Sequence, residues 1–494
     1  MKSKLTNIIL TAAVGILAVA CDDDVNLPVK ENTVELPDVE DTVSGEPYDY
    51  TQTMQPERPY MLDYSQMMMM KFHLASPDRK GGSQVFLSYD DALEYIKGLD
   101  AISRGLPKVV YLVGWQYEGH DCKYPAMDKF NETLKRPEDA TAADSFFWLR
   151  EQASRYNTIV SIHTLISDAY TDSPLWHDYV KNGFICRDAN GDFVSPGILN
   201  GQPMYYVDNY TEWKKGWLQK RLDRVVDLCR IQDVKTIHID AFQPHENVYL
   251  DVTYDMAEEV CRKVIRYLRD KGIDVTGEFW HGTTRNDTYI GLQAGAWWND
   301  LTCHERAAIP ASLSAGGRSG QFSWNANPEA AFLFGDNMMA ETTLDAITYN
   351  GIGKRAVWEE LKSDFCLMTL PYMYYNRHTV VEYQADAKRV IYSDGLTADY
   401  GRQTVTQGNM TLRDRNNVFI PALWVKDRRE IIAYSANGYN GRRWVLPADW
   451  AGVTEVTMCP LDENGVGDPV ALPVTNNSVT FSLSSGRMAV ISAN

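Results

Sequence analysis

Short apolar segments alternate with amphipathic helical segments from about residue 60 to residue 375, and this alternation constrains the fold most strongly. A strand followed by a helix, repeated along the chain, is typical of a parallel sheet covered by helices. The pattern predicts strands at 67–73, 109–114, 159–163, 236–240, 274–278 and 294–298, and helices at 90–103, 144–156, 210–231 and 251–271. An eight-stranded (β/α) TIM barrel over residues 59–378 is the simplest architecture, and an open doubly wound α/β sheet is the alternative.

The pattern of apolar and polar residues changes after about residue 380. Short segments of alternating apolar and polar residues follow one another, separated by Asn-Gly turns at 437–438, 440–441 and 464–465. This pattern is typical of antiparallel strands. It predicts a small C-terminal antiparallel β-sandwich over residues 379–494.

Asp240 closes one of the predicted barrel strands. Side chains alternate along a strand, so His238 and Asp240 share the face that would line the lumen. Barrel enzymes keep their catalytic groups at the carboxyl ends of strands. A helix cap is the structural alternative, but residues 241–244 delay the next helix. We therefore predict that Asp240 is catalytic.

Glu278 ends a strand one β/α unit later, on the same face as Thr276. Phe279 and Trp280 beside it would lower the local dielectric and raise its pKa, as a carboxylic acid that donates a proton near neutral pH requires. The alternative is a glutamate bonded to neighbouring backbone. Two carboxylates on nearby barrel strands suit retaining glycoside hydrolysis, in which one attacks the anomeric carbon and the other protonates the leaving oxygen.

A loop rich in polar and aromatic residues follows the strand at 109–114. Its side chains suit sugar binding, because rings stack on sugar faces while polar groups bind hydroxyls. The candidates in this loop are Trp115, Tyr117, His120 and Asp121, against the alternative of a surface loop with a structural His–Asp pair. Further candidate binding residues are His163, His238, Trp280 and Trp297, for which core packing is the alternative.

The sequence contains no metal-binding, nucleotide-binding or Ser-hydrolase motif, so no metal or cofactor is expected. Glu118, His120 and Asp121 are the minor alternative as metal ligands. The net charge of −18 argues against nucleic acid or an anionic membrane surface as a partner.

The barrel segment resembles glycoside hydrolase family 101, the endo-α-N-acetylgalactosaminidases. The resemblance rests on residues 114–121 with Tyr124 and Pro125, on 238–240 and on 277–278. It implies a retaining mechanism with Asp240 as nucleophile and Glu278 as acid/base, and a sugar subsite that contains His120 and Asp121. Family members release Gal-β1,3-GalNAc from Ser or Thr of mucin-type glycoproteins. This chain lacks the large additional β domains of typical members.

The N-terminus carries export signals. Lys2 and Lys4 precede an apolar run, and residues 17–21 resemble a lipobox that ends in Cys21. We expect residues 1–21 to be a lipoprotein signal peptide, with an uncleaved membrane anchor as the alternative. Residues 22–58 contain eleven acidic and two basic side chains, which predicts a disordered tether. We expect a lipid anchor to hold the protein at the outer membrane, where it extends to the cell surface.

Three functions fit these features. The first is a retaining glycosidase acting on α-linked GalNAc in O-glycans. The second is a retaining α-glycosidase of another specificity, such as an α-galactosidase. The third is a non-catalytic, glycan-binding surface lipoprotein. In each case the partner is a glycan or glycoprotein, and the oligomeric state stays open.

Overall fold

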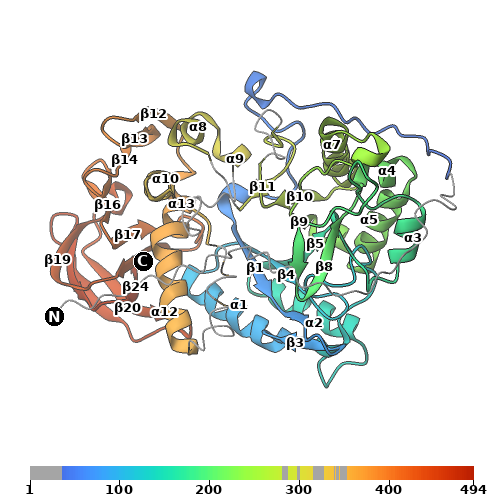
Figure 1. The fold of residues 1–494 in the computed structure, drawn as a ribbon. Coiled ribbons are helices and arrows are strands. Elements are labelled where there is room, and N and C mark those ends of the chain that lie inside the picture. Colours follow the sequence, from blue (N-terminus) through green and yellow to red (C-terminus); the bar gives the residue numbers. More distant parts are fainter. Residues whose placement is uncertain are drawn as a thin grey trace, which may run out of the picture.

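A parallel sheet forms the centre of the protein. The computed structural model describes residues 36–280, 288–297, 301–314, 327–338, 340, 344 and 353–493. The sheet has the strand order β1-β4-β5-β9-β10-β11 (Figure 1). Its strands are β1 (Met68–His73), β4 (Lys108–Val113), β5 (Thr158–Leu165), β9 (Thr236–Asp240), β10 (Asp274–Gly277) and β11 (Gly295–Ala296). All six predicted strands are therefore present, within a few residues of the expected bounds.

The strand order decides between the two architectures that the sequence left open. Within this sheet, each strand pairs with the member of the sheet that follows it in the sequence, as in a barrel. In a doubly wound sheet, the strand order reverses at one point. The described residues form a half-barrel of six strands, so the closed eight-stranded barrel that we expected is not shown. That expectation rested on chain length. In the described parts between β11 and residue 375, the chain is mainly helical instead.

Helices cover the outer face of the sheet. The long ones begin at residues that cap them: Ser88, Thr141 and Thr253 each accept a hydrogen bond from a backbone N–H of the first turn. The helices that follow the strands are α1 (Tyr89–Ser103), α2 (Ala142–Ser154), α3 (Trp176–Lys181), α4 (Asn209–Lys214), α5 (Trp217–Leu228), α6 (Ile231–Val234) and α7 (Tyr254–Asp270). Those beyond β11 are α8 (Cys303–Ala308), α9 (Ala311–Ser314), α10 (Pro328–Phe334), α12 (Lys354–Asp364), the π-helical turn η5 (Phe365–Thr369) and α13 (Leu370–Tyr375).

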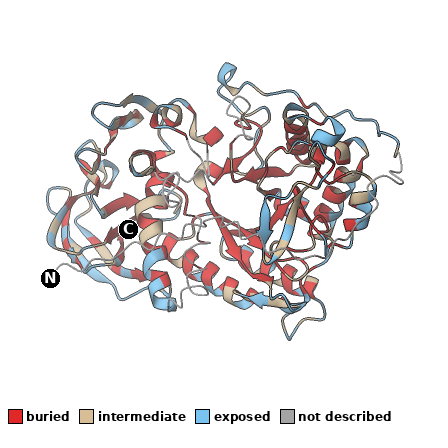
Figure 2. Ribbon diagram, in the orientation of Figure 1, coloured by how far each residue is buried: buried red, intermediate tan, exposed pale blue. Residues whose placement is uncertain are grey.

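Small sheets and short helices lie in the loops at the carboxyl ends of the strands. The hairpin β2 (Ala75–Pro77) and β3 (Ser83–Val85) follows β1, and β6 (Asp168–Tyr170), β7 (Gly197–Leu199) and β8 (Gln202–Tyr206) follow β5. Figure 2 shows the parallel strands buried, whereas β7 is exposed. The 3₁₀ turns in this half are η1 (Tyr50–Gln52), η2 (Tyr64–Gln66), η3 (Glu132–Leu134) and η4 (Val248–Leu250).

The C-terminal part is an antiparallel β structure, as predicted. One large sheet contains β12 (Val380–Gln384), β13 (Arg389–Tyr392), β14 (Leu396–Asp399), β15 (Thr404–Gln407), β16 (Met410–Asp414), β17 (Asn417–Pro421), β18 (Arg429–Ser435), β20 (Glu455–Asp462), β21 (Gly465–Val466), β22 (Val470–Pro473) and β24 (Arg487–Ala493). A second sheet of β19 (Tyr439–Val445) and β23 (Ser478–Leu483) packs on it, because Trp444 and Phe481 share a core cluster with Phe419 and Ile431. The turns η6 (Ser393–Gly395) and η7 (Ala448–Trp450) complete this part.

One apolar core runs from the parallel sheet into the C-terminal sheet, since residues of β1, α13 and β14 belong to the same buried cluster. The seven cysteines that the structure describes are all buried, and no disulfide bond joins any two of them. They act as small apolar side chains in the core. Among the described residues, no helix has the length and apolar character needed to cross a membrane.

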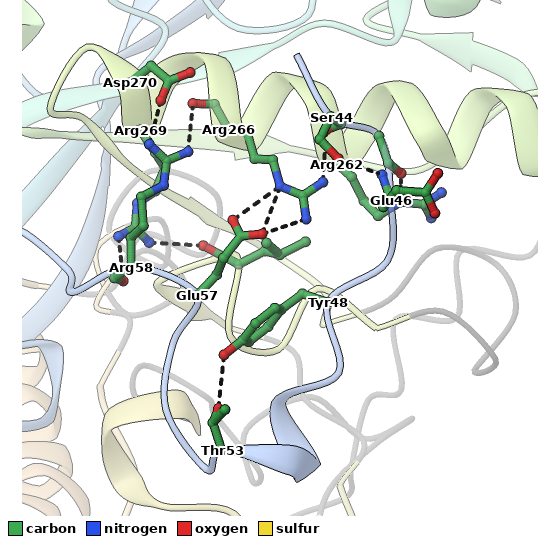
Figure 3. Close-up of polar contacts among 12 residues, drawn as sticks. Ser44, Glu46, Tyr48, Thr53, Glu57, Arg58, Arg262, Arg266, Arg269 and Asp270 are labelled. Carbon is green, nitrogen blue, oxygen red and sulfur yellow. Dashed lines mark hydrogen bonds and ion pairs between the residues drawn. The ribbon is translucent and has the colours of Figure 1, made fainter. Parts of the chain in front are cut away.

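Residues 36–58, which the sequence predicts to belong to a disordered tether, lie along α4 and α7 (Figures 1 and 3). Val39 donates a backbone hydrogen bond to Lys214, and Asp41 pairs with Lys263 at 2.7 Å. Taken without its contacts in the fold, the acidic composition of this segment indicated that the segment repels itself. In the fold, basic side chains on the helices neutralise it. We call residues 36–59 the N-terminal strap.

Three arginines of α7 hold the strap. Arg262, Arg266 and Arg269 are spaced so that they share one side of the helix, and all three are buried. Arg266 donates to the carbonyl of Ser44 at 2.8 Å and to the carboxylate of Glu57 at 2.7 Å. Arg262 donates to the carbonyl of Gly45, and Arg269 to those of Arg58 and Pro59. Figure 3 shows the strap crossing this basic side of the helix.

Candidate active site

Asp240 and Glu278 meet at the carboxyl end of the sheet. Strands β9 and β10 are parallel neighbours, with His238 opposite Thr276 and Ile239 opposite Gly277, so the next residue of each strand lies side by side. The two carboxyl groups are close enough for the charge of Asp240 to raise the pKa of Glu278. The backbone N–H of Ala241 also donates to Oε2 of Glu278 at 3.3 Å. The structure therefore brings together the two residues that the sequence selected as a catalytic pair.

Burial and charge raise the pKa of Glu278. The largest cause is desolvation, because the side chain is buried, and the second is the negative charge of Asp240 beside it. Both favour the protonated form of the acid. Lys71 and His163 act in the opposite direction and lower the pKa. The sequence indicated that burial would raise the pKa of Glu278, whereas the contribution of Asp240 became evident only from the fold.

His163 and His238 lie beneath this pair, on neighbouring strands. They are opposite each other in the β5–β9 register, and their ring centroids are 5.1 Å apart. Nε2 of His163 lies 3.3 Å from Oδ2 of Asp240. His238 is fully buried, and its Nδ1 contacts the hydroxyl of Thr276 at 3.0 Å. Burial and the neighbouring Lys71 and His163 lower the pKa of His238, so its ring is neutral.

The loop after β4 brings His120 and Asp121 to the same site. Its backbone passes close to β2: the N–H of His120 donates to the carbonyl of Ala75 at 2.9 Å, and a Cβ on Gly114 would lie 2.0 Å from that oxygen. His120 Nε2 lies 3.3 Å from Oδ1 of Asp121. Burial, and after it the charge of Asp240, raises the pKa of Asp121, while His120 lowers it. Asp121 is therefore close enough for the charges of Asp240 and Glu278 to act on it.

The four predicted aromatic residues occupy different environments. Trp115 is fully buried, donates to the carbonyl of His163 at 2.9 Å and packs on Phe130, so it supports the site from the core and has no ring face for a sugar. Tyr117 is half-buried at the edge of the loop and donates to Asp128. Trp280 is also buried, in a separate apolar cluster with Ile290 and Leu313. Trp297 is buried against His238, with ring centroids 4.6 Å apart.

The sequence analysis missed two residues, Lys71 and Asp168. Nζ of Lys71 lies 3.1 Å from Oε1 of Glu278, and both side chains are almost fully buried. Asp168 begins β6, and burial together with the charges of Asp121 and Asp240 raises its pKa well above the usual range. A signal existed for each. Lys71 is the charged residue that directly follows a run of methionines, and Asp168 lies closer to the end of its strand, β5, than Asp121 lies to the end of β4.

His163, His238 and Asp240 also form the one cluster in the described part of the chain that could hold a metal ion, with ligand atoms within 4.8 Å of one another. Lys71 lies close enough to depress the pKa of His238, and its positive charge opposes a cation at this place. Glu118 does not join such a set with His120 and Asp121. A surface cavity of about 1170 Å³ lies in the C-terminal β structure and includes none of the site residues.

With this geometry in place, comparison with known proteins becomes informative. Residues 81–305 match the model of glycoside hydrolase family 101. The family is described as endo-alpha-N-acetylgalactosaminidase. The match spans a little under half of the chain and includes Asp240, Glu278 and the loop with His120 and Asp121. It confirms over this segment the resemblance to family 101 that the sequence indicated, and it supports a glycosidase. No curated protein matches the sequence.

Solved structures of glycosidases resemble this chain to different degrees. The α-N-acetylgalactosaminidase NagBb from Bifidobacterium bifidum is 12% identical, with a TM-score of 0.52, and the match covers 69% of this chain and 58% of that protein. An α-amylase from Geobacillus thermoleovorans is 10% identical, with a TM-score of 0.43 and coverage of 88% and 99%. An α-galactosidase from Thermus thermophilus is 13% identical, with a TM-score of 0.37 and coverage of 70% and 67%. The first of these shows a common fold, although the chain spans less than two thirds of that protein.

Proposed function

We propose that this protein is a retaining glycoside hydrolase that cleaves α-linked N-acetylgalactosamine in mucin-type O-glycans and releases Gal-β1,3-GalNAc from Ser or Thr. The meeting of Asp240 and Glu278 at the carboxyl ends of β9 and β10 is the observation that carries the proposal. The family 101 match over the segment that supplies both residues supports the substrate class. His120 and Asp121 are placed to bind hydroxyl groups of the sugar.

The two carboxyl groups have distinct roles in this reaction. Asp240 attacks the anomeric carbon while Glu278 gives its proton to the leaving glycosidic oxygen, and the glycosidic bond breaks. Water then attacks the same carbon, Glu278 accepts a proton from the water, and the electron pair of the ester bond returns to Asp240. In retaining enzymes the carboxyl groups are about 5–5.5 Å apart. Here the charge of Asp240 acts on Glu278, which supports placing both carboxyl groups in one sugar site.

Aryl α-glycosides test the proposal. Wild-type protein is incubated with the aryl α-glycosides of GalNAc and of Gal-β1,3-GalNAc, and released phenol and sugar are measured. Wild-type protein is expected to release the intact disaccharide. The rate of release is expected to fall by at least about 1000-fold in Asp240→Asn and in Glu278→Gln, because the pair acts as a unit. NMR of the first-formed anomer checks retention. Release from the monosaccharide alone would indicate an exo-acting α-glycosidase. Glycan binding without turnover would indicate a non-catalytic receptor.

We also propose that Cys21 is acylated and that the protein is an outer-membrane lipoprotein facing the cell surface. Residues 1–35, which carry the signal peptide, Cys21 and the start of the predicted tether, lie outside the described residues. The lipobox-like segment at 17–21 supports this proposal. Metabolic labelling with a palmitate analogue tests it: Cys21→Ser is expected to lose the label, and surface proteolysis of whole cells reports the exposed side.

A further inference from the structure

Lys71 is a buried cation in β1, where it follows three methionines and precedes Phe72 and His73. In β1, Met68, Met70 and Phe72 pack into the large core cluster, whereas Lys71 points to the opposite face, where its Nζ lies 5.6 Å from the ring centre of Trp297. The residue is 3% exposed. A buried ammonium group is costly unless it is paired. Its retention at the centre of the site therefore indicates a role beyond packing.

The contact with Glu278 suggests this role. Nζ of Lys71 lies 3.1 Å from Oε1 of Glu278, and the other oxygen of this carboxyl group accepts a hydrogen bond from the backbone N–H of Ala241 at 3.3 Å. The charged and titratable groups that act on Glu278 from the described elements are Asp240 of β9, Lys71 of β1, His163 of β5 and Asp121 of the loop after β4. In the free enzyme, burial and Asp240 outweigh Lys71 and keep Glu278 protonated.

This balance changes during the reaction. When Asp240 forms an ester with the sugar, it loses its negative charge, and the repulsion that favoured protonated Glu278 disappears. Lys71 makes no bond that this step breaks, so its attraction persists. Glu278 has by then lost its proton to the leaving group. The carboxylate that remains faces a neutral ester on one side and the ammonium group on the other.

We propose that Lys71 is a positioning residue that holds Glu278 as a carboxylate in the second half-reaction, so that the residue which acted as an acid can act as a base on water. This inference rests on the proposed function, because it assigns a role within the same retaining reaction. No bond to Lys71 forms or breaks. The proton that Glu278 takes from water replaces the one that left with the aglycone.

Kinetics of Lys71→Met test the inference. Methionine matches the neighbours of Lys71 in β1, and protonated Glu278 leaves no bare charge, so the variant is expected to fold with an unchanged circular dichroism spectrum. With an activated aryl glycoside, we expect a rapid first turnover followed by a steady state slower by about 10–100-fold. This is less than the roughly 10²–10⁴-fold that general base catalysis contributes, because Glu278 itself remains. Azide attacks the glycosyl ester without a base, and it is expected to restore the steady-state rate.

The conservative variant and the pH profile separate this role from a structural one. Lys71→Arg keeps the charge and is expected to retain most of the steady-state rate. In Lys71→Met, the alkaline limb of kcat/KM is expected to move to higher pH, because the group that favoured ionised Glu278 is absent. The inference would be overturned if the rates of the first turnover and of the steady state fell together, azide had no effect, and the alkaline limb of kcat/KM did not shift.

A measurement without turnover separates the inference from the proposed function. With ¹³C-labelled glutamate, and Glu278→Gln to assign the signal, the carboxyl carbon of Glu278 is titrated by NMR. We expect its midpoint to rise in Lys71→Met and to fall in Asp240→Asn. If the wild type cleaves the glycosides but the midpoint stays constant in Lys71→Met, the role of Lys71 is refuted. If neither glycoside is cleaved although the midpoints shift, the function fails and the electrostatic coupling stands.

Discussion

Nε2 of His163 lies 3.3 Å from Oδ2 of Asp240, and the backbone carbonyl of the same histidine accepts a hydrogen bond from Trp115. The imidazole is buried, and its strand is fixed by pairing on both sides. His163 is therefore placed to set the orientation of Asp240, the proposed nucleophile, while Trp115 holds the strand from the core.

Replacing His163 by Gln is expected to lower kcat/KM for the aryl glycoside by roughly 100-fold, because a displacement of about 1 Å at the reacting centre has that effect. Steady-state kinetics measure it. His177 is exposed on α3, so His177→Gln is the matched control and is expected to leave kcat/KM unchanged. Equal kinetics for the two variants would show that His163 does not orient Asp240.

The raised pKa of Glu278 predicts the pH dependence of activity. The acid must carry its proton in the first step, and burial and Asp240 raise its pKa above the ordinary value of roughly 4.3. Activity is therefore expected to persist well above pH 4.3 and to decline as pH rises through the raised pKa. The kcat/KM profile measures this alkaline limb, which reports the free enzyme. A decline that begins near pH 4.3 would contradict the burial argument.

The strap predicts a contribution to stability from Arg266. The guanidinium is 7% exposed, and Arg266→Ala leaves Glu57 and the carbonyl of Ser44 without this donor. Loss of about 1–3 kcal/mol in the free energy of unfolding is expected. Chemical denaturation measures it. Arg355 also pairs with a glutamate, but it is 88% exposed. Arg355→Ala should therefore stay within about 0.5 kcal/mol of wild type. If both variants lose the same amount, the strap does not stabilise the fold.

Gly114 predicts the sensitivity of the His120–Asp121 loop to backbone geometry. Its φ is +76°, and an added Cβ would meet the carbonyl of Ala75 at 2.0 Å. Gly114→Ala is expected to displace the loop and to lower both thermal stability and kcat/KM. Gly272 has nearly the same φ, +75°, with nothing within 4 Å of an added Cβ. Gly272→Ala thus has only the conformational cost, roughly 1–2 kcal/mol. Similar losses in the two variants would remove the steric argument.

The parts of the fold with strong periodicity were predictable. The strands, the helices at 90–103 and 251–271, and the pairing of Asp240 with Glu278 all follow from alternation and from position at the end of a strand. The number of strands did not follow, because chain length does not distinguish strands from the helices found between β11 and β12. The environments of Trp115 and Trp280 also needed the fold, since an aromatic residue near a site packs inward as readily as it faces a ligand.

Lys71 and the strap were missed for a common reason. Each depends on a partner more than 100 residues away, Glu278 for the lysine and α7 for the strap, and local composition carries no information about such partners. An acidic segment was therefore interpreted as self-repelling, although its counter-charges lie on a helix. The run of methionines before Lys71 indicated burial, but its partner Glu278 follows β10, which does not pair with β1, so only the three-dimensional fold identifies it.

The strap has a practical consequence for producing the protein. A recombinant version that begins at residue 60, where the barrel pattern starts, would uncover Arg262, Arg266 and Arg269 along one side of α7 and remove the acceptors that the strap provides for them. Such a truncation would aggregate or bind anions at a surface that the natural chain covers. A start before residue 36 keeps that side of the helix closed.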